Sequence, residues 1–256
     1  MRRRAMLTGS SAAFLTKTAI GQDRRANTLR FVPVANLSVL DPVWSSGDGP
    51  VTSLHGNYVF DTLYAVDGSL TSRPQMASGH EVSDDGRTWR IRLRDGLTFH
   101  DATPVRAIDC IASLQRWCAC TPFGQLLSQA VDTSAARDDR TIEIRLTRPF
   151  PLLLDAIALP DNAAWIMPEH LAHTDPNTAV KEMVGSGPYR FIAGEYNSGN
   201  RVVYEKFDAY VPRKEPPDWA SGGKIVHFGR VECSRLGHRR RRADDRRSRL
   251  VGRTGS

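Results

Sequence analysis

The sequence predicts a mixed α/β protein, and three observations carry this prediction. Runs in which apolar and polar residues alternate, at residues 88–94 and 141–146, are typical of half-buried strands. A stripe of apolar residues at helical spacing follows Pro104 and predicts an amphipathic helix. No stretch approaches the roughly 18 uninterrupted apolar residues that a membrane span needs, so no such span is expected. The 256 residues suffice for one large domain or two ordinary ones.

The first predicted elements are a strand and a helix. Residues 29–34 are a short apolar run that predicts the first strand. Residues 40–47 contain an Asp-Pro pair followed by Ser and Gly residues, which favour a loop. From Thr52 to Tyr64, apolar residues recur at helical spacing and predict a helix.

Two Asp-Gly turns frame the next strand. The first, at Asp85-Gly86, leads into residues 88–94, where Trp89, Ile91 and Leu93 share one face. Three arginines alternate with them and are expected on a solvated face. The second turn follows at Asp95-Gly96.

The second half of the chain also predicts both helices and strands. A helix is expected to begin at Pro104, with a stripe formed by Val105, Ile108, Ile111 and Leu114. Residues 141–146 predict a strand whose Ile142, Ile144 and Leu146 face inward, and a short helix is expected from Leu152. Residues 185–188, Gly-Ser-Gly-Pro, form a junction before strands at 189–192 and 201–205. This junction lacks the Lys of a P-loop, so it predicts no phosphate site.

The charge of the chain is concentrated at its two ends. The whole sequence carries +7, but residues 229–256 alone hold ten arginines against three acidic residues. Residues 1–21 add four basic residues. The body, residues 22–228, holds 21 basic and 25 acidic residues and is mildly acidic. The basic balance therefore says nothing about a nucleic-acid partner for the body.

Residues 1–21 have the order of a signal peptide. Arg2-Arg3-Arg4 precedes an apolar stretch that ends in the small residues Ala19 and Gly21. Arg3-Arg4 followed by Ala-Met-Leu also resembles a twin-arginine signal. No Cys lies near the expected cleavage site. The segment predicts export to the periplasm as a soluble protein without a lipid anchor, and a disordered basic N-terminus is the alternative.

The cysteines and histidines predict neither a metal site nor a disulfide framework. Cys118-Ala119-Cys120 is too tight for a zinc knuckle, and Cys110 fits a buried helical position. Glu169, His170 and His173 are the nearest approach to a ligand cluster, but they lack the spacing of zinc hydrolases. We expect no cofactor and no metal.

Four blocks of the sequence carry a family resemblance, and they occur in register. They are residues 57–64 (NYVFDTLY), 84–101 (DDGRTWRIRLRDGLTFHD), 184–191 (VGSGPYRF) and 204–210 (YEKFDAY). Together they resemble the family 5 extracellular solute-binding proteins, the peptide- and nickel-binding class that serves ABC importers. The resemblance covers roughly residues 28–228.

This resemblance implies a periplasmic-binding-protein-like fold of type II, with two lobes that close on a ligand. For this chain it implies only the first lobe, residues 22–228, with an inserted subdomain at about residues 45–180 and the second lobe missing. The implied function is capture of oligopeptides or a similar small solute, delivered to a permease in the inner membrane, by a monomer that is not an enzyme and binds no nucleic acid. Residues after the first strand are the expected substrate-binding set: Trp44, Ser45, Ser46, His55 and Tyr58. For Trp44 and Tyr58, a place in the core is an equal alternative.

Residues 229–256 depart from the family and are expected to be an anomalous, disordered tail. The segment is rich in Arg and holds no Lys, Phe, Trp, Tyr, Ile or Met. GC-rich codons that are translated out of frame produce Arg-rich, Lys-free sequences of this kind. We therefore expect a change of reading frame between about Phe228 and Cys233. The truncated product is expected to fold poorly and to bind ligand weakly or not at all.

Two other functions stay open. An interaction protein would bind nucleic acid or an acidic partner through the Arg-rich tail. A metal-dependent hydrolase would rest on His170 and His173, and adjacent His100-Asp101 does not place a base beside its orienting carboxylate.

Overall fold

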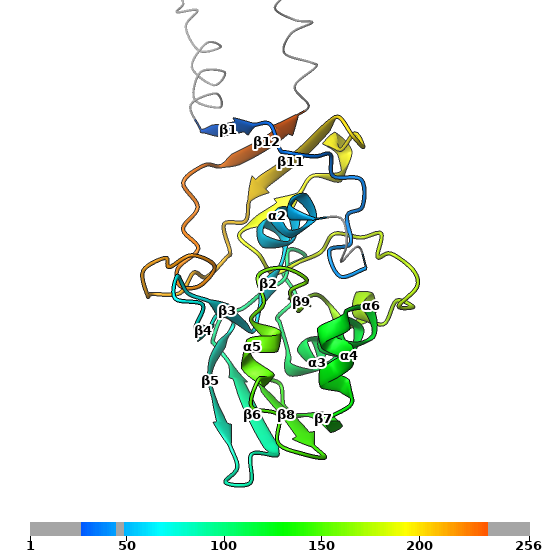
Figure 1. Cartoon of the computed structure of the whole chain (residues 1–256). Coiled ribbons are helices and arrows are strands. Elements are labelled where there is room, and N and C mark those ends of the chain that lie inside the picture. The colour runs from blue at the N-terminus through cyan, green and yellow to red at the C-terminus, as the bar shows by residue number, and fades with distance from the viewer. Residues whose placement is uncertain (1–26, 45–48, 235–256) are drawn as a thin grey trace, which may run out of the picture.

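Residues 27–44 and 49–234 are described in the computed structural model. A four-stranded sheet forms one end of the molecule, in the order β1-β12-β11-β10 (Figure 1). Its strands are β1 (Thr28–Phe31), β10 (Tyr189–Phe191), β11 (Arg201–Lys206) and β12 (Arg230–Ser234). β1 pairs in parallel with β12, whereas β11 is antiparallel to both of its neighbours. β1 lies far along the chain from the other three strands, so its place in the sheet depends on a long-range pairing with β12.

The other end of the molecule holds a second four-stranded sheet, in the order β5-β6-β8-β7 (Figure 1). Its strands are β5 (Ala77–Val82), β6 (Thr88–Leu93), β7 (Val131–Asp138) and β8 (Thr141–Leu146), and all pairs are antiparallel. The alternation predicted for β6 and β8 is confirmed, because the apolar residues at alternate positions in both strands are buried.

Short elements and helices connect the two sheets. The remaining elements are the paired strands β2 (Asp61–Thr62) and β9 (Trp165–Ile166), the paired strands β3 (Tyr64–Val66) and β4 (Ser72–Pro74), and the helices α2 (Pro50–Val59), α3 (Ala107–Cys120), α4 (Pro122–Ser128), α5 (Leu153–Ile157), α6 (Glu169–Ala172) and the 3-10 turn η1 (Ala193–Glu195). Among the described residues, no helix is both long and apolar enough to cross a bilayer.

Two predicted helix boundaries are wrong, and tertiary pairing explains both. The helix expected over 52–64 ends at Val59, because Asp61 and Thr62 pair with Ile166 and Trp165 as strands. The helix expected from Pro104 begins at Ala107, because Pro104 forms a bridge with Thr98. In addition, α2 lies within the range expected for the subdomain but packs against β10 of the first sheet. α2 also contacts β2, and the expected boundary of the subdomain at about residue 45 stays a prediction.

The junction between the subdomain and the first sheet is pinned by His100. Its backbone N–H donates to the Gly185 carbonyl, and its Nδ1 accepts from the Gly185 N–H. Its Nε2 lies 3.0 Å from the Gly187 carbonyl oxygen, which fixes Nε2 as the protonated nitrogen. Junction residues also lie against the backbone at the end of α2, where a Cβ on Gly187 would approach the Phe60 carbonyl oxygen to 2.7 Å. Glycine is therefore required at this position for close backbone approach.

The start expected for the anomalous tail, residue 229, is wrong. Residues 230–234 form β12, which lies between β1 and β11. Val231 is 1% exposed and Cys233 is 5% exposed, so their side chains belong to the core. The body of the fold therefore extends to Ser234, and the rest of the expected tail, residues 235–256, lies outside the described residues, as does the signal peptide at 1–21.

Candidate functional site

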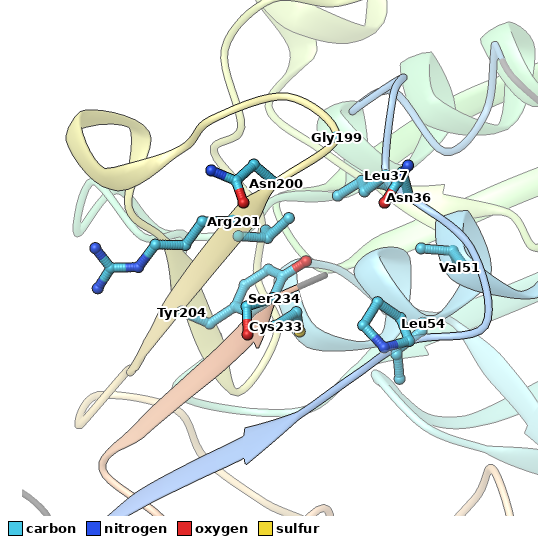
Figure 2. A pocket seen from close by; sticks show the side chains of 12 residues that line it. Asn36, Leu37, Val51, Leu54, Gly199, Asn200, Arg201, Tyr204, Cys233 and Ser234 are labelled. Atoms are coloured by element: carbon cyan, nitrogen blue, oxygen red, sulfur yellow. The ribbon is translucent and has the colours of Figure 1, made fainter. Parts of the chain in front are cut away.

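A small cavity opens at the carboxyl ends of the parallel strands β1 and β12 (Figure 2). Its volume is 20 Å³, room for about one water molecule. The lining residues come from the segment after β1, from α2, from the start of β11 and from the end of β12: Pro33, Asn36, Leu37, Val51, Leu54, Gly199, Asn200, Arg201, Val202, Tyr204, Cys233 and Ser234. Ligands of open α/β sheets bind outside the carboxyl ends of the strands. We therefore take this cavity as the candidate ligand site.

The polar groups at this cavity are suited to hydrogen bonding. Asn36 and Asn200 supply amides and Ser234 supplies a hydroxyl. Burial raises the pKa of Cys233 to about 12 and raises the pKa of Tyr204 well above its ordinary value, so both groups are neutral near pH 7. Neutral thiol and phenol groups are poor nucleophiles. Most of the surface of the cavity is apolar, and these few polar groups are the ones available to hydrogen-bond a solute.

His55 lies beneath the cavity and does not line it. The side chain is 1% exposed, and its Nδ1 lies 2.9 Å from the Tyr204 hydroxyl. Its ring also contacts Phe191 edge-on, with 5.7 Å between ring centroids. Burial lowers the pKa of His55 to about 3. The predicted ligand contact is thus a neutral core residue that orients Tyr204.

Stability is expected to fall as the pH drops below 6.5, because two histidines are buried in their neutral form. Burial lowers the pKa of His55 to about 3 and that of His100 to about 4, from an ordinary value of 6.5. Below pH 6.5 the unfolded chain binds protons that the folded chain does not. The free energy of unfolding therefore falls by up to about 1.4 kcal/mol per pH unit for each histidine, until the folded-state pKa is reached. Above pH 6.5 this effect vanishes. Urea unfolding at about pH 7 and about pH 5 measures it.

The variant His100→Gln tests the assignment. It is expected to flatten the dependence on pH, because Gln does not titrate, and the exposed His227→Gln controls for the same substitution at a surface position. Glutamates titrate near 4.5 in the unfolded chain, so the interval from 6.5 to 4.5 reports mainly on histidines. Equal stability of the parent protein at both pH values would contradict the prediction.

Tyr58 lines a second and larger groove on the other side of α2. This groove has a volume of 580 Å³ and is bordered by Tyr189, Trp219 and Ile225, among other residues. The Tyr58 ring packs between aromatic rings, 5.2 Å from that of Tyr189 and 4.9 Å from that of Tyr204, centroid to centroid. Tyr58 is therefore both a packing residue and a groove residue, and it lies outside the lining of the strand-end cavity.

Trp44 is exposed at the end of the segment that follows β1. Its side chain is 41% exposed, and its backbone N–H donates to Asp41 Oδ1 at 3.1 Å. It is absent from the lining of the strand-end cavity. Ser45 and Ser46 lie outside the described residues. His55 and Tyr58 thus lie on different faces of α2, and Trp44 lies in the segment that precedes this helix.

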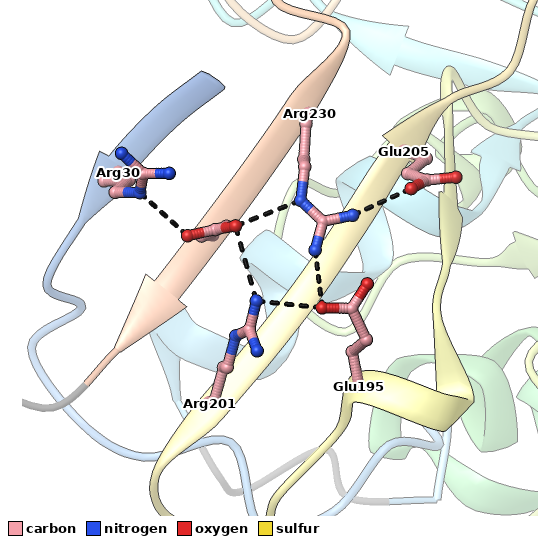
Figure 3. Close-up of polar contacts among 6 residues, drawn as sticks. Arg30, Glu195, Arg201, Glu205 and Arg230 are labelled. Carbon is pink, nitrogen blue, oxygen red and sulfur yellow. Dashed lines mark hydrogen bonds and ion pairs between the residues drawn. The ribbon is translucent and has the colours of Figure 1, made fainter. Parts of the chain in front are cut away.

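The sheet face that points away from α2 carries an ion-pair network (Figure 3). Arg230 contacts Glu195, Glu205 and Glu232, and Arg30 and Arg201 also contact Glu232. Arg201 also contacts Glu195. Three arginines face three glutamates, so the network has no net charge. Arg230 and Glu232, which were expected in the anomalous tail, thus have specific partners in the body.

The side chains considered for metal binding or catalysis make ordinary structural contacts in the described part of the chain. Within residues 27–44 and 49–234, no group of three or more His, Cys, Asp or Glu side chains is placed to hold a metal. His173 Nε2 lies 3.6 Å from Glu169 Oε1, and Glu169 also pairs with Arg106. His100 contacts backbone groups of the junction instead of pairing with Asp101. The four described cysteines are free thiols.

Sequence reasoning missed the residues that form the cavity. Asn200 directly precedes β11, Tyr204 lies in β11 and Ser234 ends β12, all more than 140 positions beyond α2. Tyr204 belongs to one of the family blocks, but nothing in that block marks it as a cavity residue. The pairing of β1 with β12 places these residues beside the cavity. The periodicity of apolar residues along the chain does not predict this pairing.

The fold is shared with solved periplasmic binding proteins. A structure of the binding protein AgaA of A. tumefaciens R10 in complex with agropinic acid has a TM-score of 0.65 and 25% identity, covering 85% of this chain and 41% of its own. The periplasmic binding protein DppA of Helicobacter pylori, in complex with the peptide STSA, has a TM-score of 0.63 and 23% identity, covering 82% and 42%. The chain therefore has the mixed α/β fold of the periplasmic binding proteins.

Sequence comparisons identify the family. The model described as "Bacterial extracellular solute-binding proteins, family 5 Middle" matches residues 71–234. A "Probable peptide ABC transporter periplasmic-binding protein y4tO" of Sinorhizobium fredii is 38% identical over 84% of this chain and 39% of its own length. The glutathione-binding protein GsiB of Pectobacterium atrosepticum is 28% identical over 71% of this chain and 39% of its own length. This chain belongs to the family 5 bacterial extracellular solute-binding proteins, and it spans about 39% of the length of these relatives.

Proposed function

We propose that this chain represents the first lobe of the periplasmic substrate-binding component of an ABC importer for peptides or similar small polar solutes. The observation that carries the proposal is the cavity at the carboxyl ends of β1 and β12, which is lined mostly by apolar surface with the amides of Asn36 and Asn200 beside it, in a chain similar to a probable peptide-binding relative. The lobe supplies one wall of the site, and a second lobe supplies the other. Its role is to capture a solute and to present it to a permease in the inner membrane.

The size of the cavity explains why we expect weak binding by this chain alone. A volume of 20 Å³ does not enclose a peptide, whereas small-molecule sites typically have about 300–1,000 Å³. A solute would rest on the lobe with most of its surface in water. We therefore propose that ligand capture by this chain is impaired.

Binding of trialanine and of glutathione is expected to be undetectable or weak for the chain itself, and strong for a chimaera. The chimaera joins residues 1–234 to the remaining part of the Sinorhizobium fredii relative. Because the second lobe excludes water and buries the solute, its affinity should be at least about a hundredfold higher. Isothermal titration calorimetry measures both proteins.

Variants of the chimaera assign the binding to the cavity. Asn36→Ala together with Asn200→Ala is expected to weaken binding, whereas exposed Gln125→Ala in α4 serves as the control. A chimaera that folds but binds neither solute would contradict the peptide proposal. Equal affinity of chain and chimaera would contradict the proposed impairment.

A further inference from the structure

A buried ion pair lies beneath the segment that leads to Trp44. Arg116, on α3, is 3% exposed, and Asp41, ten residues after β1, is 1% exposed. Arg116 Nη2 lies 2.6 Å from Asp41 Oδ2. The two residues are 75 positions apart in the sequence, so the pair joins the first segment of the lobe to the subdomain.

Hydrogen bonds from this pair fix three backbone segments at once. Arg116 donates to the carbonyl oxygens of Thr174 and Thr178, at 2.6 and 2.9 Å. Asp41 accepts from the backbone N–H groups of Val43 at 3.0 Å, Trp44 at 3.1 Å and Val180 at 2.8 Å. Asp41 thus holds the Trp44 backbone directly, and Arg116 holds Asp41.

The cost of this arrangement suggests a role beyond stability. Burying two charges costs several kcal/mol per ion, and apolar pairs of similar volume are often equally stabilising. The ion pair adds a fixed orientation of the groups that it contacts, because the planar guanidinium and the carboxylate form hydrogen bonds in only a few geometries. This pair fixes the direction of the backbone at Trp44.

The segment that contains Trp44 lies close to the start of α2. A cavity of 150 Å³ is lined by Pro42 and Gly49, on either side of the Trp44 position in the sequence, and by the first residues of α2. α2 also lines the strand-end cavity through Val51 and Leu54. The Trp44 segment therefore borders the same helix as the candidate ligand site.

We propose that Arg116 and Asp41 are positioning residues for ligand binding: they hold the Trp44 backbone beside the start of α2, where its exposed side chain contacts the part of a solute that extends beyond the strand-end cavity. This inference rests on the proposed function for its ligand, but its structural part is independent of that function. Arg116 contacts no solute and acts through Asp41.

The variant Arg116→Lys tests the inference in the full chain. Lys keeps the positive charge but loses the planar fork, so Asp41 loses its fixed orientation. Amide hydrogen exchange at Val43, Trp44 and Val180 is expected to accelerate at least about fivefold, as for the loss of one buried hydrogen bond. Acrylamide quenching of Trp44 fluorescence, obtained by difference from Trp44→Phe, is expected to rise.

A control of matched stability separates positioning from general destabilisation. Ile142→Val removes one methylene group from the core of the second sheet, far along the chain from Asp41. It is expected to lower the melting temperature while leaving exchange at Val43 and Trp44 unchanged. Unchanged exchange in Arg116→Lys, or equal acceleration in both variants, would overturn the inference.

Trialanine binding to the chimaera tests the link to the ligand. With Arg116→Lys in the chimaera, the affinity is expected to fall at least about fivefold. Faster exchange with unchanged affinity would overturn the role in ligand binding. Should the parent chimaera fail to bind, the proposed function falls, and the exchange data alone still decide whether the pair positions Trp44.

Discussion

Deletion of residues 230–256 is expected to unfold the chain, whereas deletion of residues 235–256 is expected to leave its melting temperature within about 3 °C of the parent protein. β12 lies between β1 and β11; it pairs with β11 along its whole length and with β1 from Arg230 to Cys233. Its removal would leave β1 without a partner in the first sheet and would expose apolar residues beneath it. Loss of two buried side chains and of the paired strand should cost about 5 kcal/mol or more.

The two deletions are controls for each other, because they differ only in residues 230–234. Circular dichroism and thermal unfolding measure the outcome. Similar melting temperatures for the two products would show that β12 is dispensable and would restore the tail boundary at residue 229. The double variant Arg230→Gln and Glu232→Gln keeps the strand but removes its ion pairs, so it separates pairing from charge.

Replacement of Gly185 by Ala is expected to destabilise the protein by about 3–5 kcal/mol. A Cβ at Gly185 would collide with the Val59 carbonyl oxygen at the end of α2, and this is a backbone atom that has no rotamer to change. The junction would have to move away from α2, and the hydrogen bonds between Gly185 and His100 would be lost with it. Because α2 borders the strand-end cavity, the same shift would weaken solute binding by the chimaera.

Gly194→Ala is the matched control for this variant. A Cβ at Gly194 meets no atom within 4 Å, and its backbone does not require glycine, so stability should change by less than about 1 kcal/mol. Urea unfolding of both variants gives the comparison. A Gly185→Ala protein as stable as the Gly194→Ala protein would show that the junction is free to move.

The parts of the fold that were predicted correctly depend on local patterns. The strands at 88–93 and 141–146 alternate strictly, and each Asp-Gly turn determines where its strand begins or ends. The family was also predicted, because its motifs are short and contiguous in the chain. These features need only neighbours within a few residues, which a single sequence displays.

Polar residues on strands were predicted less well. Arg90 was expected on a solvated face, and it is about half-exposed, but it donates to Glu143 at 3.0 Å. Glu143 occupies a polar position in the alternation of its strand, yet it is 3% exposed. Arg137, together with Arg90 and Arg145, covers it and lowers its pKa to about 2. Two guanidinium groups from the adjacent strands β6 and β7, and one from the same strand as Glu143, bury a charge that the alternation predicted to be exposed to water.

By itself, the sequence determined the class of the fold, the family and the order of its local elements. The tertiary structure decided which residues form the candidate site. It placed His55 under Tyr204, made residues 230–234 the middle of a sheet, and joined Asp41 to Arg116. The physical reason is the same in each case: burial and charge pairing depend on groups that are distant in the chain, and only packing brings them within contact.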